Sequence, residues 1–185
     1  MELVSNYLTR ARYHRVIPYL RGDILEIGCG MSPVIATLSA SQNYCGIDVE
    51  SSFVTLLRQL FPTREFHQLN VEQDTLALGE KQFDTLLLVA VLEHLACPAK
   101  VLSALTAYLK NGGQVVLTTP TPVGHRMHRL GARCGIFSRV AAEDHRSILD
   151  KEDLQHICES IGLKLRVYRS FQFGGNQLVV AEKCV

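Results

Sequence analysis

The sequence lacks the cysteine and histidine patterns of a structural metal site or a disulfide framework. Its six cysteines are scattered, no two of them form a Cys-x-x-Cys pair, and none stands with histidines at zinc spacing. This argues against a zinc module and against a disulfide-bonded secreted scaffold. We expect the cysteines to be small core residues in a reducing cytosol, and we expect no metal.

The sequence also lacks any apolar run that approaches a membrane span. Residues 1–15 are polar and basic, without the apolar segment of a secretion signal. The prediction is a cytoplasmic protein with no membrane span. A chain of 185 residues, 47% of them hydrophobic, fits a single domain, residues 1–185, with one substantial core.

There is little excess charge of either sign. The formal net charge is +1, which argues against a dedicated nucleic-acid binder. Two segments are nevertheless basic. Residues 1–22 hold four arginines against one glutamate, and residues 121–149 hold five arginines against one glutamate and one aspartate. Positive charge is therefore concentrated in two segments, and the rest of the chain is acidic on balance.

What the sequence does have is a regular alternation of elements. From residue 23 on, short β-branched or leucine-rich runs alternate with longer segments of helical period, which predicts a parallel sheet covered on both faces. Strands are predicted at 23–28, 43–48, 64–69, 83–90, 113–119, 163–171 and 176–183. Helices are predicted within 1–22 and at 33–40, 51–60, 98–110 and 150–161. The sequence Phe173-Gly174-Gly175-Asn176 indicates a hairpin, so the last strand is expected to be antiparallel.

The most informative stretch is Asp-Ile-Leu-Glu-Ile-Gly-Cys-Gly at residues 23–30. It predicts a buried strand followed by a tight turn at Gly28 and Gly30, where the backbone can lie against a ligand with no Cβ in the way. The helix opened by Pro33 would add unpaired N–H groups and a positive dipole end. A structural turn that binds no ligand is the alternative.

The spacing of this turn argues against NAD. A dinucleotide fingerprint has its third glycine three residues after the second. Here that position is Pro33, which has no N–H to donate to a phosphate. Glu26 would also repel a pyrophosphate, whereas it suits a ligand that carries an ammonium group.

The pattern Glu-x-Gly-x-Gly resembles motif I of the class I S-adenosylmethionine-dependent methyltransferases, with Ser32 where that family usually has glycine. The likeness extends over roughly residues 20–183, and its most specific stretches are similar to the small-molecule branch related to quinone-biosynthesis methyltransferases. Those stretches are Phe83-Asp84, Val91-Leu92-Glu93-His94-Leu95, Tyr108-Leu109-Lys110-Asn111-Gly112-Gly113 and Thr119-Pro120. The resemblance implies an α/β fold, a Rossmann-like, seven-stranded, mostly parallel sheet with an antiparallel last strand and helices on both faces. It also implies S-adenosyl-L-methionine as cofactor and S-adenosyl-L-homocysteine as product.

The resemblance, together with the place of ligands on open α/β sheets, implies a set of cofactor contacts. Asp48 would accept hydrogen bonds from both ribose hydroxyls, although it could instead cap the helix at 51. Asn70 would bond the adenine amino group, unless it is only a turn residue. The predicted cofactor-binding residues are Glu26, Gly28, Cys29, Gly30, Asp48, Val49, Asn70, Val71 and Val89.

The segment 121–149 is long for a connection after a strand, and loops of that length are usually functional or disordered. We expect it to close over the methyl group as a substrate-side lid, with the helix in residues 1–22 as the other wall; a solvated basic loop is the alternative. Arginine suits carboxylates and phosphates, so the acceptor is expected to be anionic. The predicted substrate-binding residues are Arg126, His128 and Arg129, and the candidate general bases are His145 and His125. His94 is expected to be structural.

These features predict transfer of a methyl group to an oxygen or nitrogen atom of a small, acidic molecule. An RNA or protein methyltransferase is one alternative, although the chain has no added recognition domain and no Asn/Asp-Pro-Pro-Tyr/Phe motif after the strand at 83–90. A cofactor-binding partner subunit that has lost catalysis is another. Ser32 and Asn70, the two departures from the family pattern, keep that alternative open.

Overall fold

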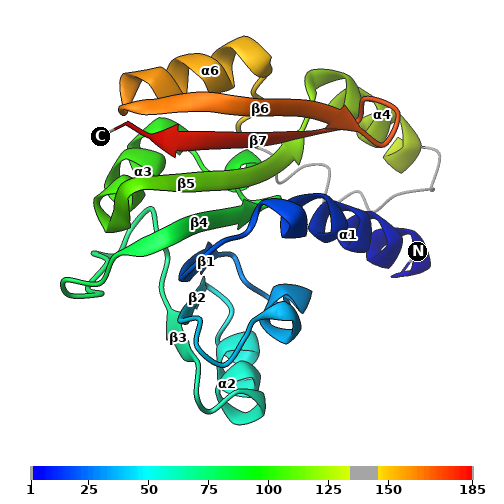
Figure 1. Ribbon diagram of the computed structural model, residues 1–185. Coiled ribbons are helices and arrows are strands. Elements are labelled where there is room, and N and C mark those ends of the chain that lie inside the picture. The colour runs from blue at the N-terminus through cyan, green and yellow to red at the C-terminus, as the bar shows by residue number, and fades with distance from the viewer. Residues whose placement is uncertain (1, 134–145, 185) are drawn as a thin grey trace.

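The structure, a computed structural model, describes residues 2–133 and 146–184, and the side chains of residues 7–127 and 146–184. A seven-stranded sheet forms its centre (Figure 1). The strands are β1 (Ile24–Ile27), β2 (Tyr44–Asp48), β3 (Glu65–Gln68), β4 (Phe83–Val89), β5 (Leu109–Pro120), β6 (Leu163–Phe171) and β7 (Asn176–Lys183). The α-helices within the described ranges are α1 (Glu2–Val16), α2 (Ser51–Leu60), α3 (Pro98–Leu105), α4 (Pro122–Arg133) and α6 (Lys151–Ser160). Short 3-10 helices are η1 (Ile17–Tyr19), η2 (Pro33–Thr37), η3 (Leu92–His94) and η4 (Thr106–Tyr108).

The strand order is β3-β2-β1-β4-β5-β7-β6. The first five strands in this order pair in parallel, whereas β7 pairs antiparallel with both β5 and β6. Strand β1 is buried at every residue because helices cover both faces of the sheet, which is why apolar residues of β1 point to both faces. The predicted Rossmann-like sheet with an antiparallel last strand is confirmed.

Successive residues of each strand point to opposite faces of the sheet, and their side chains form two hydrophobic cores, one on each face. On one face, α1, η2 and α2 pack against the sheet through Tyr13, Val16, Val34 and Val54. On the other face, the packing of α3 and α6 includes Leu102, Leu105, Leu154 and Cys158. In Figure 1, α2 lies beside β3 at one end of the sheet and α6 lies along β6 at the other.

Most predicted boundaries are confirmed within a residue or two, including the helix at 51–60 and the strands at 163–171 and 176–183. Helix α6 begins after Asp150, whose side chain accepts a hydrogen bond from the Asp153 backbone N–H at 2.9 Å, while the Asp153 side chain bonds back in a capping box. Among the described helices, none is long and apolar enough to cross a membrane.

Two of the predicted helices are wrong in length. The helix predicted at 33–40 is the five-residue 3-10 helix η2, because the chain is already extended at Leu38. The helix predicted at 98–110 ends at Leu105, and β5 begins at Leu109 rather than at 113. Lys110 lies in this extra stretch of β5, where its ammonium donates to Asp84 Oδ2 at 2.7 Å.

The α-helix in residues 1–22 is also shorter than predicted. Within residues 1–22, α1 ends at Val16, and η1 follows it with Pro18 in its first turn. Within residues 121–149, α4 occupies the first part, and residues 134–145 lie outside the described residues.

Candidate active site

The strand order reverses at β1, which pairs with β2 on one side and with β4 on the other. In open α/β sheets, ligands bind outside the carboxyl ends of the strands at such a switch point. Gly28 follows β1 at this edge and Ala90 follows β4. Ala90 has a φ of 56°, a left-handed conformation that is uncommon outside glycine and often marks a functional site.

The glycine turn after β1 is held from within the protein. The backbone N–H groups of Gly28 and Cys29 both donate to the Ile47 carbonyl, at 2.8 and 3.1 Å. Gly28 has a φ of 66°, and a Cβ there would lie 2.6 Å from Val91 Cγ2. Around Gly30 the situation is the reverse, since a Cβ there would have no atom within 4 Å. The turn therefore presents open space at Gly30 while its backbone is fixed at Gly28.

Asp48, at the carboxyl end of β2, closes this turn from the neighbouring strand. Its Oδ2 accepts a hydrogen bond from the Gly30 N–H at 2.8 Å, and its Oδ1 accepts one from the Glu50 N–H at 2.9 Å. The residue that caps α2 is Glu50, so the alternative of Asp48 as the helix cap is wrong. Val49 is 62% exposed beside it. An acidic group next to an exposed apolar side chain and an open glycine fits the ribose and adenine of a nucleoside cofactor.

Asn70 follows β3 at the same edge. Its side-chain Oδ1 accepts a hydrogen bond from the Glu72 N–H at 3.0 Å, and its own N–H donates to Asp74 Oδ2 at 2.7 Å. Asn70 is thus a turn residue in this structure, and its side-chain amide nitrogen is the group left to face an adenine. Val71 packs partly buried against the core under α3. The cofactor roles of both residues stay predictions.

Glu26 is fully buried in β1 and is held by two tyrosines. Tyr44 donates its phenol to Oε2 at 2.7 Å, and Tyr13 of α1 donates to Oε1 at 3.1 Å. Burial raises the pKa of Glu26 to about 7, and hydrogen bonds from Tyr44, Ser32 and Tyr13 lower it only in part. Burial also raises the pKa of both tyrosines, so they act as neutral donors. The Glu26 carboxylate is therefore bonded to Tyr13 and Tyr44 in this structure, and its predicted contact with the ammonium group of a ligand stays a prediction.

Cys29 and Val89, two of the predicted cofactor-binding residues, lie in the same hydrophobic core as Tyr13. Cys29 is 1% exposed, and burial, with Glu26 next, raises the pKa of its thiol. Its contribution to a ligand site is thus through the shape of the turn. Val89 is 8% exposed and ends β4 next to Ala90.

A second buried carboxylate is Glu93 in η3, the short helix that follows β4. Its Oε2 accepts a hydrogen bond from the Thr119 hydroxyl at 3.1 Å, and its backbone carbonyl accepts from the Arg146 N–H at 2.7 Å. Burial raises the pKa of Glu93, while the charge of Arg12 opposes that rise. Arg12 also donates to Asn176 at 3.2 Å. Glu93 thus links η3 to β5 and to the chain at 146.

The predicted substrate side lies where α4 follows β5. The His125 N–H donates to the Thr121 carbonyl at 2.8 Å, which places His125 in the first turn of α4, and Arg126 next to it is exposed. The side chains of His128 and Arg129 and all of His145 lie outside the described residues. Their predicted roles stay predictions.

The two sides of α1 differ. Tyr13 and Arg12 point inward to the buried carboxylates, whereas other residues of the helix line a groove of about 670 Å³ between α1 and the β6 edge. The cationic and aromatic residues of this groove are Tyr7, Arg10, His14, Arg15, Tyr19, Arg169 and Phe171. Two of the four arginines of the first segment, Arg10 and Arg15, therefore line this groove.

Sequence reasoning did not identify Tyr44 and Arg12 as partners of the buried carboxylates. The register pairs Glu26 with Gly46 on β2, so Tyr44, two residues earlier, lies on the same face. That alternation was visible in the sequence, but it indicates a contact only once the two strands are known to be neighbours.

Comparison with known proteins decides the family. A family described as a methyltransferase domain matches residues 6–167. The chain belongs to this methyltransferase family. The methyltransferase fold predicted from motif I is thus confirmed, and the family uses S-adenosylmethionine as its methyl donor.

Relatives of this methyltransferase include the ubiquinone biosynthesis O-methyltransferase of Albidiferax ferrireducens, 26% identical over 86% of this chain and 67% of that protein. The tRNA U34 carboxymethyltransferase of Pseudoalteromonas translucida is 30% identical over 64% of this chain and 39% of that protein. The chain therefore spans about two thirds or less of the length of these curated relatives.

Solved structures share the fold of this methyltransferase. The plantazolicin methyltransferase BpumL, in complex with a desmethyl analogue and S-adenosylhomocysteine, has a TM-score of 0.74 at 14% identity, covering 100% of this chain and 90% of that one. The magnesium protoporphyrin IX methyltransferase of Synechocystis, with bound S-adenosylhomocysteine, has a TM-score of 0.68 at 18% identity, covering 92% and 81%.

Proposed function

We propose that this protein transfers the methyl group of S-adenosylmethionine to an oxygen or nitrogen atom of a small molecule that carries an acidic group. The observation that carries the cofactor half is Asp48 at the carboxyl end of β2, tied to Gly30 and flanked by exposed Val49. Ligands of open α/β sheets lie across this edge. The relatives named for ubiquinone biosynthesis are O-methyltransferases, which supports a small-molecule acceptor and oxygen chemistry.

The residues present fit S-adenosylmethionine, which supplies an electrophilic methyl group on a sulfonium that is already a good leaving group. Asp48 would hold the ribose hydroxyls and Val49 would pack on the adenine, while the open side of Gly30 leaves room for the rest of the nucleoside. The protein's own contribution is then positioning, and removal of a proton where the acceptor requires it. His125, in the first turn of α4, and His145 are the proposed bases.

The basic residues of α4 support an acidic acceptor. Arg126 is exposed one turn beyond the carboxyl end of β5, and Arg129 follows it three residues later in the same helix. A guanidinium group binds a carboxylate or phosphate through two parallel hydrogen bonds. Arg12 would attract an acidic acceptor less strongly, because the nearby charge of Glu93 offsets that of its guanidinium group.

An RNA methyltransferase is the second candidate, favoured by the tRNA-modifying relative. It requires binding to tRNA that weakens steeply with salt. A catalytically inactive partner subunit is the third candidate, and turnover of any acceptor would remove it.

Cofactor binding is tested at Asp48. Calorimetric titration with S-adenosylmethionine and S-adenosylhomocysteine should show binding that weakens about 100-fold in Asp48→Ala, because a charged acceptor of two hydroxyl hydrogen bonds is lost. Asp48→Asn keeps one oxygen for the Gly30 N–H but loses the acceptor of the Glu50 N–H, and it should bind about 10-fold less tightly than the wild type. Equal affinity in all three proteins would rule out the ribose role of Asp48.

The acidic acceptor is tested by charge reversal in α4. With an acceptor found in a screen of phenols and phosphosugars, Arg126→Glu should raise KM for the acidic compound about 10-fold, and Arg129→Glu should add to the effect. Neither change should alter KM for the neutral ester of the same acceptor. Lys164→Glu, exposed near the start of β6 at the opposite edge of the sheet, is the matched control. An unchanged KM in the double variant would mean that the acceptor does not contact these arginines.

A further inference from the structure

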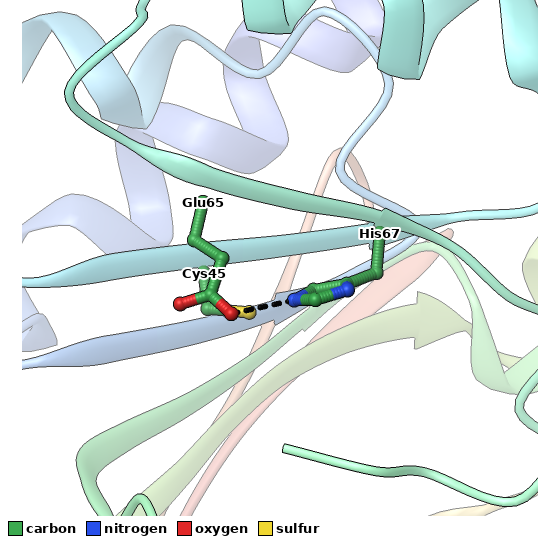
Figure 2. Close-up of side chains that lie close together, drawn as sticks. All are labelled: Cys45, Glu65 and His67. Carbon is green, nitrogen blue, oxygen red and sulfur yellow. Dashed lines mark hydrogen bonds and ion pairs between the residues drawn. The ribbon is translucent and has the colours of Figure 1, made fainter.

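Three side chains of different ligand type meet where β2 pairs with β3. Cys45 is opposite Glu65 in the parallel register, and His67 lies two residues further along β3 on the same face. Figure 2 shows Glu65 and His67 turned toward one another, with the Cys45 sulfur beside their contact. Glu65 Oε1 and His67 Nε2 are 2.7 Å apart, and all three ligand atoms lie within 4.8 Å of one another.

The three groups differ in burial in a way that suits a bound ion. Cys45 is 1% exposed and forms the floor of the group. The side chains of Glu65 and His67 are 36% and 32% exposed and form its rim, so an ion can enter from solvent. Both strands belong to the sheet, so the three Cα positions are fixed before any ion arrives.

We propose that Cys45, Glu65 and His67 form a zinc-binding site that links the edge strand β3 to β2. A thiolate, an imidazole and a carboxylate are the three side-chain ligands that zinc takes in proteins, at about 2.0–2.3 Å from the metal. Such distances place the donor atoms of a tetrahedral set about 3–4 Å apart, so the group has only to rearrange slightly. Three protein ligands leave the fourth position for a water molecule.

The charges of the site are consistent with a divalent cation. The thiolate and the carboxylate together carry two negative charges, opposite in sign to Zn²⁺. The ammonium of Lys81 contacts the other oxygen, Glu65 Oε2, and is half exposed, so it can remain there as the partner that orients the carboxylate. Binding forms an S–Zn bond and releases the thiol proton to solvent.

Position gives the site a structural role. β3 is an edge strand with a single neighbour in the sheet, and it is four residues long. It leads directly into Asn70 and Val71. A zinc ion bound to both strands would therefore hold the loop at Asn70 and Val71 in place relative to β2, whether or not a methyl group is transferred.

Zinc binding is tested on the whole chain, without a histidine tag and after treatment with a chelator. Competition with a chromophoric chelator should show one Zn²⁺ per chain, and Co²⁺ should give the thiolate charge-transfer absorption that reports a Cys–metal bond. Saturating zinc should raise the Tm by about 5 °C or more. Cys45→Ala and His67→Gln should each weaken zinc binding at least 10-fold.

Cys158→Ala is the matched control, because Cys158 is also 1% exposed in the same core but lies on α6. It should bind zinc as the wild type does. His67→Gln, at the rim, serves if Cys45→Ala does not fold. Zinc uptake that is equal in His67→Gln and the wild type, or the absence of a thiolate band with Co²⁺, would overturn the proposal and leave an ion-pair cluster over a core cysteine.

Discussion

Replacing Gly28 by alanine is expected to lower the free energy of unfolding by about 2–5 kcal/mol. The left-handed φ of 66° costs an L-residue about 1–2 kcal/mol. The added Cβ would also lie 2.6 Å from Val91 Cγ2, and relieving such an overlap in a packed region costs about 1–3 kcal/mol. Chemical denaturation of the variant and the wild type measures the sum.

Two further variants separate these causes. Gly30→Ala meets only the backbone cost, because a Cβ at Gly30 has no atom within 4 Å and its φ is 41°. It should therefore lose about 1 kcal/mol of stability. The double variant Gly28→Ala/Val91→Ala removes the overlap, so it should be less destabilised than the sum of the two single changes. Additive effects would show that Val91 does not limit the space at Gly28.

The second large effect expected is a pH-dependent loss of stability caused by Glu26. An unfolded glutamate titrates near pH 4.5, whereas burial raises the pKa of Glu26 to about 7 in the native protein. Between these values the native state binds more protons, so the free energy of unfolding falls as pH rises. The Glu26 contribution is complete below pH 4.5 and is lost as pH passes 7, and it amounts to about 3 kcal/mol.

Glu26→Gln isolates this contribution, because the neutral amide has the same shape and does not titrate. The difference in unfolding free energy between Glu26→Gln and the wild type should shift by about 2–3 kcal/mol in favour of the variant between pH 5 and pH 8. Glu93, whose pKa burial also raises, is present in both proteins and cancels in the comparison. A difference that stays constant with pH would mean that Glu26 titrates normally.

The parts of the fold that the sequence predicted are those with local signals. The ends of β1 and β2 follow from apolar runs that stop at Gly28 and Asp48, and α6 follows from its cap at Asp150. These signals lie within a few residues of the element that they define. The place of Asp48 at the cofactor edge follows in the same way, because parallel strands share a carboxyl edge.

The parts that could not be predicted depend on contacts between distant segments. Pro33 is a suitable first residue for either an α-helix or a 3-10 helix, so the type of helix depends on how residues 33–40 pack against the sheet. The meeting of Tyr13, Tyr44 and Glu26 requires the position of α1 and the register of β2. The group at Cys45 and His67 has no sequence spacing that marks a metal site, because its members come from two paired strands.

The position of β7 sets the order in which the chain can complete its sheet during synthesis. β7 lies between β5 and β6 but follows both in the sequence, so β6 has no partner in the sheet until residues 176–183 have left the ribosome. At about 5–20 residues per second, α6 and β6 are made seconds after β5 and then wait with an unpaired strand. A chain truncated before residue 176 and released from the ribosome should therefore contain β1 to β5 assembled and β6 open to proteolysis, and β7 joins the two parts in a single late step.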